Sequence, residues 1–287
     1  MTDRWYLVEN VDEIASPALL VYLDRVRENL RRIIALAGGV ERLRPHMKTH
    51  KMAEIIQMQR EAGISKFKCA TIAEAETAAS VGAEDVMLAY PPVGPNPQRL
   101  VQLVKAFPNT KFSTIGDDAG ALRRLSDAFA AGGETIEVLL DIDNGMHRSG
   151  IAPGEKAADV YRLLADLPGL KPGGFHVYDG HAREADLQAR IKHAEADFVP
   201  VEQLRSRLEA AGLPVPRIVA GGTPTFPVHA RHADRECSPG TCVFWDENYA
   251  GKFPDLEFLP AALLLTRVIS KPGDNRLCLD LGYKAIS

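Results

Sequence analysis

Cysteine is scarce in this chain of 287 residues, and the four that occur are scattered without a C-x-x-C pair: Cys69, Cys237, Cys242 and Cys278. Without such pairs, neither a disulfide framework nor a zinc site built from thiolates is expected. We therefore expect reduced thiols.

Long apolar runs and an excess of basic residues are also lacking. The longest apolar run near the C-terminus covers residues 259–266, far short of the roughly 20 residues that cross a bilayer, and the polar N-terminus has no signal-peptide core. Lys and Arg number 34 against 38 Asp and Glu, a net charge of −4, which offers no broad basic face to a polyanion. We expect a cytoplasmic protein with no membrane or nucleic-acid partner.

Short β-rich apolar segments alternate with longer amphipathic stretches, a pattern that predicts repeated βα units and a parallel sheet. The candidate strands are residues 18–23, 42–48, 66–71, 85–90, 111–115, 136–141, 173–178 and 217–220. Helical spacing of apolar residues predicts helices at 24–37, 52–62, 72–81, 97–106, 119–131, 154–167 and 186–211. No G-x-G-x-x-G follows the first strand, which disfavours a dinucleotide-binding open sheet. The predicted fold class is α/β, a (β/α)8 TIM-like barrel.

The pattern changes after Gly221 to turn-rich sequence with β-like runs at residues 241–245, 262–270 and 276–281. We predict a barrel over residues 1–235. Within this range, residues 1–24 could instead contribute to a neighbouring β domain. Residues 236–287 are predicted to begin a C-terminal β domain. Three runs are too few to close an independent β domain, so we expect it to be incomplete.

Ligand chemistry collects at the carboxyl ends of the strands in a parallel barrel. The segment Leu43-Arg-Pro-His-Met-Lys-Thr-His-Lys51 ends one candidate strand with two lysines. Desolvation and cationic neighbours such as His46 or Arg44 would lower the pKa of a lysine here and free its amine as a nucleophile. A solvated basic loop is the plainer alternative, and residue chemistry does not choose between Lys48 and Lys51.

Two further strand ends carry polar side chains. Arg148 follows the strand at residues 136–141 and could donate to a cofactor or a carboxylate, or form a salt bridge with Asp141 or Asp143. His176, Tyr178 and His181 end the next strand, where they suit proton transfer or an aromatic wall, or a structural histidine.

Two glycine-rich turns ending in hydroxyls, residues 220–225 and 237–241, follow the last barrel strand. Such turns present backbone N–H groups to a phosphate, at the place where barrels commonly bind one. The pair His229 and His232 lacks the carboxylate of helical zinc motifs, and we expect it to be structural or on the surface.

The segment Arg44-Pro-His-Met-Lys-Thr-His-Lys51 resembles the cofactor-lysine motif of the D-threonine aldolase and D-serine dehydratase family, which are fold-type III pyridoxal phosphate enzymes with an alanine racemase-like barrel. The similarity continues in order through residues 68–76, 143–148, 178–181, 220–224 and 237–241. The resemblance covers nearly the whole chain.

This resemblance implies that Lys48, rather than Lys51, forms the Schiff base with pyridoxal 5′-phosphate. It makes Arg148 a partner on the cofactor-ring side and Tyr178 a wall of the active site. The implied phosphate cradle consists of Gly222, Thr223, Gly240 and Thr241. It also implies that Lys48, Tyr178 and His181 are the catalytic residues.

The family carries a His-x-Cys-type motif that binds a divalent metal, Mn²⁺ or Zn²⁺, and no such motif occurs in this sequence. We therefore expect the family's metal ligands to be missing here and the metal-assisted step to be lost or weakened. Either the chain is cut short or it is inactive alone. The resemblance also implies pairing as a homodimer.

The activity that the resemblance implies is a pyridoxal phosphate-dependent lyase acting on D-β-hydroxy amino acids. The first expectation is retro-aldol cleavage of D-threonine to glycine and acetaldehyde, with His181 or a metal-bound water as base. D-serine dehydration or racemisation, with Lys48 as base in the dehydration, is the second, and a non-catalytic pyridoxal phosphate carrier is the third.

Overall fold

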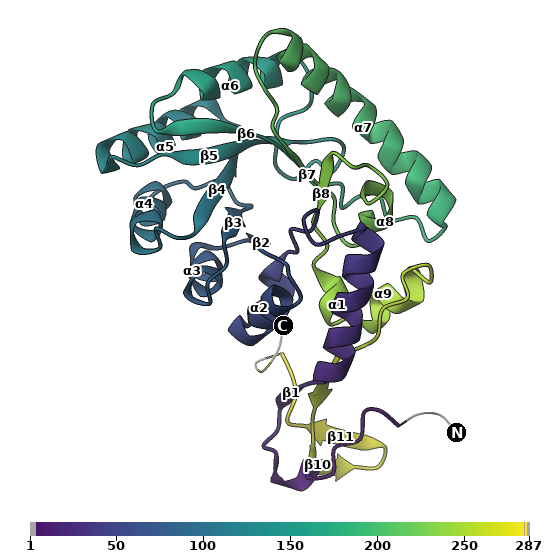
Figure 1. Cartoon of the computed structure of the whole chain (residues 1–287). Helices are drawn as coiled ribbons and strands as arrows, with labels where there is room; N and C mark the ends of the chain where they lie inside the picture. The colour runs from purple at the N-terminus through teal and green to yellow at the C-terminus, as the bar shows by residue number, and fades with distance from the viewer. Residues whose placement is uncertain (1–3, 284, 286–287) are drawn as a thin grey trace.

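A curved sheet of parallel strands forms the centre of the molecule in the computed structural model, which describes residues 4–283 and 285. The sheet order is β2-β3-β4-β5-β6-β7-β8 (Figure 1). Its strands are β2 (Lys66–Cys69), β3 (Asp85–Leu88), β4 (Lys111–Gly116), β5 (Ile136–Ile142), β6 (Leu170–Val177), β7 (Ile218–Ala220) and β8 (Arg235–Cys237).

Residues 42–46 close this sheet into a barrel. The Arg44 amide donates to the Cys237 carbonyl of β8 at 2.9 Å, and the Lys68 amide of β2 donates to the Pro45 carbonyl at 2.9 Å. The segment therefore pairs on both sides as the eighth strand. Because Pro45 has no N–H and the chain turns into the short helix η2 (Met47–Thr49), the pairing is reduced to isolated bridges.

Helices cover the outside of the barrel, one after most strands (Figure 1). Their apolar faces pack on the sheet, and several begin with a capping side chain; Thr71, for example, accepts from the Glu74 amide. The helices are α1 (Leu23–Ala37), α2 (Ala53–Glu61), α3 (Ile72–Ser80), α4 (Asn96–Ala106), α5 (Ala119–Gly132), α6 (Glu155–Asp166), α7 (Leu187–Ala210), α8 (Phe226–His229) and α9 (Glu247–Lys252).

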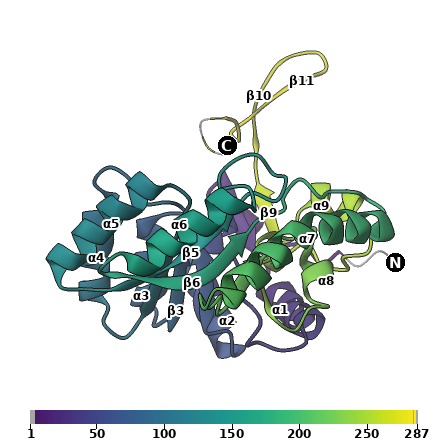
Figure 2. The same cartoon turned by 90° about the horizontal axis from the view of Figure 1, so that it is seen from above.

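A smaller β region lies beside the barrel. The strand β1 (Ala18–Val21) pairs antiparallel with β9 (Ala262–Leu265), so the two ends of the chain meet there. The hairpin of β10 (Val268–Gly273) and β11 (Arg276–Leu279) projects away from the barrel (Figure 2).

The barrel fold is confirmed, with three differences in its strands. The candidate strand at 18–23 lies outside the barrel, in β1, where its partner β9 is more than 200 residues away in sequence. The strand β8 was not predicted because two of its three residues, Arg235 and Glu236, are charged and form no apolar run. Residues 241–245 are not a strand: Thr241–Val243 form the short helix η3, and a φ of +49° at Trp245 interrupts extended backbone.

The domain boundary expected between residues 235 and 236 falls inside β8. The division into domains stays a prediction.

Apolar clusters lie on both faces of the barrel sheet, and a charged layer lies at one end of the barrel. The larger cluster lies between sheet and helices, and a smaller one inside the barrel consists of Met87, Ile115, Leu139 and Val219. At the amino ends of the strands the fully buried Arg44 guanidinium contacts Asp85 and Glu236, each at 2.7 Å. No helix in the described part of the chain is long and apolar enough to cross a membrane.

Candidate active site

Lys48 and Lys51 point to different surroundings. Lys48 lines a cavity of about 570 Å³ at the carboxyl ends of the strands, together with His46, Ala70, Ala89, Tyr90, Pro91, Val93, Arg148 and Ser149. Lys51 instead forms an ion pair with the buried carboxylate of Glu74 and is not among these lining residues. The structure thus leaves the Lys48 amine available where the sequence could not choose.

The Lys48 amine titrates below the ordinary range of a lysine. Partial burial lowers its pKa most, and the positive charge of Arg148 lowers it further, while Glu74 opposes the shift. The charged neighbour is therefore Arg148, rather than the expected Arg44, whose guanidinium is held by carboxylates at the opposite end of the barrel. A lowered pKa increases the fraction of unprotonated, nucleophilic amine at neutral pH.

The ring of Tyr178 forms a wall beside this amine. Tyr178 follows β6, and its ring centroid lies 6.0 Å from Lys48 Nζ and 4.7 Å from the Arg148 guanidinium carbon. Arg148 makes no salt bridge to Asp141 or Asp143 in the structure, because His176 and Ser149 bind Asp141 and His147 binds Asp143. The Arg148 guanidinium remains free to bind an oxygen or a carboxylate of a ligand.

The two glycine-rich turns meet at the same end of the barrel. The Thr223 hydroxyl accepts from the Gly240 amide at 3.1 Å and the Thr241 amide at 3.0 Å, so these donors converge on one point. A Cβ at Gly222 would lie 2.9 Å from the Tyr178 ring, so only glycine lets the ring approach this turn. Backbone N–H groups and a hydroxyl suit a phosphate, which here would take the place of the Thr223 hydroxyl as the acceptor of both amides.

These residues fit pyridoxal phosphate, because the Lys48 amine and Arg148 line one cavity, the Tyr178 ring lies beside both, and the two glycine-rich turns lie at the same end of the barrel. Each predicted cofactor residue therefore lies at the carboxyl end of the barrel.

Buried polar and charged side chains lie inside the barrel, among them His176, which was a candidate from the sequence, and Lys68, which was not. His176 Nδ1 lies 2.7 Å from Asp141 Oδ1, and both side chains are buried. Lys68 of β2 is buried beside them; burial above all, and then the charge of Lys48, lowers its pKa to about 7. In the sequence, Lys68 could have been recognised as a lysine at an alternate position of a candidate strand and at the start of the similar segment 68–76.

His181 is not among the side chains that line the cavity. Its Nε2 is 2.6 Å from Asp197 Oδ2 of α7, and its Nδ1 is buried without a partner among the described residues. His229 is fully buried, and its Nε2 lies 2.6 Å from Asp179 Oδ2, which confirms the structural role expected for it.

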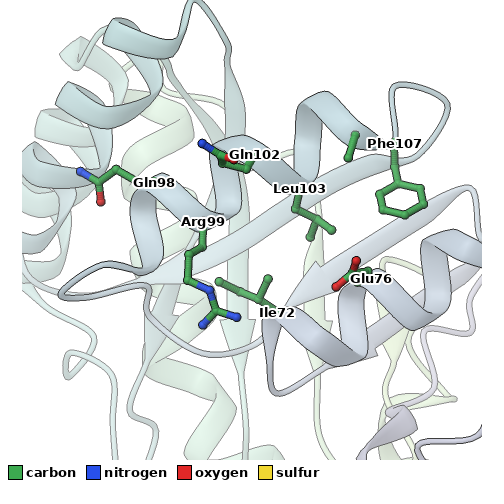
Figure 3. A pocket seen from close by; sticks show the side chains of 8 residues that line it. Ile72, Glu76, Gln98, Arg99, Gln102, Leu103 and Phe107 are labelled. Carbon is green, nitrogen blue, oxygen red and sulfur yellow. The ribbon is translucent and has the colours of Figure 1, made fainter.

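A second hollow, of about 400 Å³, lies on the outside of the barrel between α3 and α4. Figure 3 shows Ile72 and Glu76 of α3 facing Arg99 and Leu103 of α4 across it. No lysine lines it and it lies away from the glycine-rich turns, so we do not assign it a catalytic role.

The sequence profile described as the alanine racemase N-terminal domain matches residues 21–248, well over half of the chain. The chain belongs to this family. Its barrel and its candidate lysine both lie within the matched residues.

Within the alanine racemase N-terminal domain family, the chain is similar to a D-threonine aldolase of Arthrobacter sp, with 30% identity over 281 residues, 95% of this chain and 73% of that protein. It is also 32% identical over 238 residues to the D-threo-3-hydroxyaspartate dehydratase of Delftia sp. strain HT23, covering 80% of this chain and 61% of that protein. Both relatives are enzymes of D-amino acids, as the resemblance in the sequence predicted.

A solved structure also shows similarity to a D-threonine aldolase. The crystal structure of D-threonine aldolase from Filomicrobium marinum superposes with a TM-score of 0.87 at 28% identity, over 96% of this chain and 74% of that one. The predicted relationship and the barrel with an adjoining β region are therefore confirmed.

Proposed function

We propose that this chain binds pyridoxal 5′-phosphate on Lys48 and acts as a lyase on D-β-hydroxy amino acids. Retro-aldol cleavage of D-threonine to glycine and acetaldehyde is the leading reaction. The observation that carries the proposal is the Lys48 amine, placed in the cavity beside Tyr178 and an Arg148 with no carboxylate partner among the described residues. The similarity to D-threonine aldolases supports it.

When bound, pyridoxal phosphate withdraws electrons from the bond that breaks at the substrate Cα. The side chains of the protein would position the reactants. Tyr178 would lie against the cofactor ring, and the Arg148 guanidinium would donate a hydrogen bond to an atom of that ring. Thr223 and the amides of Gly240 and Thr241 would hold the phosphate. Lys48 would supply the amine for attachment, since its lowered pKa favours the unprotonated form.

The proton that leaves the substrate decides between two reactions. For aldol cleavage a base takes the β-hydroxyl proton, and His181 stays the predicted base for that step. For D-serine dehydration a base removes the Cα proton, and Lys48 is the predicted base because its amine lines the cavity. This position, with the similarity to a dehydratase, makes dehydration the second candidate, with racemisation beside it. A non-catalytic cofactor carrier is the third.

A product assay separates these functions. The full chain is incubated with pyridoxal phosphate and Mn²⁺, then with D-threonine or D-serine, and acetaldehyde and pyruvate are measured. Acetaldehyde from D-threonine is expected. Pyruvate from D-serine would show a dehydratase, and cofactor binding without either product, and without loss of optical activity, would show a carrier.

Lys48→Ala and Lys51→Ala form a matched pair for the attachment site. Borohydride reduction and peptide mass mapping should find the pyridoxyl group on Lys48 in the parent protein and in Lys51→Ala, and no attached group in Lys48→Ala. A pyridoxyl group on Lys51 would overturn the assignment.

The remaining expectations also stay part of the proposal: a small D-amino acid as substrate, pairing as a homodimer, a cytoplasmic location and a dependence on a divalent metal. The exposed side chains of Val268, Ile269 and Leu277 on the projecting β10–β11 hairpin are consistent with pairing.

A further inference from the structure

Three side chains with metal-ligating atoms meet beside the end of β6. His181 comes from the loop that follows β6, whereas His193 and Asp197 lie one turn apart on α7. The Nε2 atoms of His181 and His193 lie 2.6 Å and 3.2 Å from the same carboxylate oxygen, Asp197 Oδ2. All three ligand atoms lie within 4.8 Å of one another, and each side chain is partly buried.

A fourth side chain fixes the orientation of one imidazole. Glu184 Oε1 lies 2.6 Å from His193 Nδ1, so the Nε2 of that ring faces the cluster. A carboxylate on the distal nitrogen is the usual support of a metal-binding histidine, since it fixes the ring and increases its basicity. Glu184 and Asp197 together also give the cluster two acidic groups, which favours a cation.

The spacing requires little adjustment to hold an ion. Zinc binds nitrogen and oxygen at about 2.0–2.2 Å, and two such ligands of a tetrahedral ion lie about 3.4 Å apart. The His193–Asp197 separation of 3.2 Å already fits this value. The His181–Asp197 separation of 2.6 Å would lengthen by less than 1 Å.

We propose that His181, His193 and Asp197 bind a divalent metal ion with the preferences of Zn²⁺, which ties the loop after β6 to α7. Two imidazoles and one carboxylate are ligands that such an ion favours, and a fourth position stays open to water. The site lies on the barrel and uses none of the residues of a His-x-Cys motif, which this sequence lacks.

The ion would also fix the two loops that carry Arg148 and Tyr178. Gly145 has a φ of +133°, and a Cβ there would lie 2.6 Å from His181 Nε2, so the loop after β5 packs directly against the proposed ligand. Tyr178 precedes His181 by three residues. A metal-bound His181 would position these loops and would not serve as the hydroxyl base, so the titration below also bears on that role.

Metal binding by the untagged full chain tests the proposal. Protein freed of metal by a chelator is titrated with Co²⁺ and with Zn²⁺, and stoichiometry, affinity and the visible absorption of Co²⁺ are recorded. We expect one ion per chain, and an affinity at least tenfold lower in His193→Ala and Asp197→Asn, with loss of the cobalt bands. Glu184→Gln should lower the affinity about 10- to 100-fold and keep the stoichiometry, because it removes only the support of His193.

His147→Ala is the matched control. His147 and Asp143 have the same spacing of four residues as His193 and Asp197, at 2.9 Å, but His147 is 83% exposed and no third ligand among the described residues accompanies the pair. This variant should bind the ion as the parent protein does. Absence of binding by the parent protein, or equal binding by all the variants, would overturn the proposal. Because no cofactor is needed, the measurement does not depend on lyase activity, and of the proposed function it bears only on the role of His181 as the base.

Discussion

Lys48 and Lys51 show how neighbouring groups give two identical side chains different chemistry. The ammonium of Lys51 is neutralised by Glu74, whereas Lys48 has a cationic neighbour in Arg148 and shares a cavity with it. A nearby positive charge disfavours the charged form of an amine. The difference in partners therefore leaves the Lys48 amine, with its lowered pKa, available in the cavity.

Replacing Arg148 by Gln should raise the pKa of Lys48, because the variant removes the nearby positive charge that lowers it. A larger fraction of the amine is then protonated at neutral pH. We expect attachment of pyridoxal phosphate to become about fivefold slower near pH 7, equivalent to ~1 kcal/mol for a solvent-screened pair of charges. The pH profile of the attachment rate should move to higher pH.

Arg162→Gln is the control for that profile, since Arg162 is a surface residue of α6 paired with Asp159. Its profile should match that of the parent protein. An unchanged profile in Arg148→Gln would show that the charge of Arg148 does not act on Lys48.

At the scale of elements, the turn after β7 and the loop after β6 support one another. Asp179 is buried and accepts from the Thr225 hydroxyl at 2.6 Å, and its other oxygen lies 2.6 Å from His229 Nε2. These contacts join the end of β6 to the start of α8 and fix the turn that contains Gly222 beside Tyr178. The position of the aromatic wall thus depends on two loops.

Gly222→Ala should displace the Tyr178 ring, because the added Cβ would lie 2.9 Å from it. Overpacking of this kind costs about 1–3 kcal/mol. We expect the dissociation constant for pyridoxal phosphate to rise at least ~5-fold, measured by absorbance titration. Gly251→Ala in α9, where a Cβ meets no atom within 4 Å, should leave it unchanged. Equal affinities for both variants would contradict the role given to Gly222.

At the scale of the whole molecule, ionic contacts between distant segments hold the base of the barrel together. Arg44, from the segment that closes the barrel, contacts Asp85 of β3 and Glu236 of β8, and Lys66 of β2 contacts Glu236 as well. Burial raises the pKa of both carboxyls, but the charge and hydrogen bonds of Arg44 outweigh it and leave both pKa values below their ordinary range. The barrel therefore closes through charge as well as through backbone pairing.

Arg44→Met should lower the free energy of unfolding by about 3–5 kcal/mol, measured by urea denaturation, because it leaves two largely buried carboxylates without their main partner. Carboxyls with lowered pKa values stabilise the fold above their ordinary values of 3.8 and 4.5, and this stabilisation is lost as pH falls through the lowered values. The difference between parent and variant should thus shrink below about pH 4.

Arg27→Met removes an exposed ion pair with Asp24 and should change stability by less than about 0.5 kcal/mol. A cost for Arg44→Met as small as this one would show that the base of the barrel does not depend on the charges.

The sequence by itself determined the repeated βα units, the cofactor lysine motif and the family, because apolar periodicity and local motifs are properties of consecutive residues. It could not place β8, whose charged residues Arg235 and Glu236 form no apolar run. It also could not pair β1 with β9, because a pairing between distant segments leaves no pattern in either one. Only the tertiary structure placed Arg148 against Tyr178 and paired Lys51 with Glu74. It also brought His181 close to His193 and Asp197. Such contacts join separate elements, and the pKa of a side chain depends on the neighbours that folding provides.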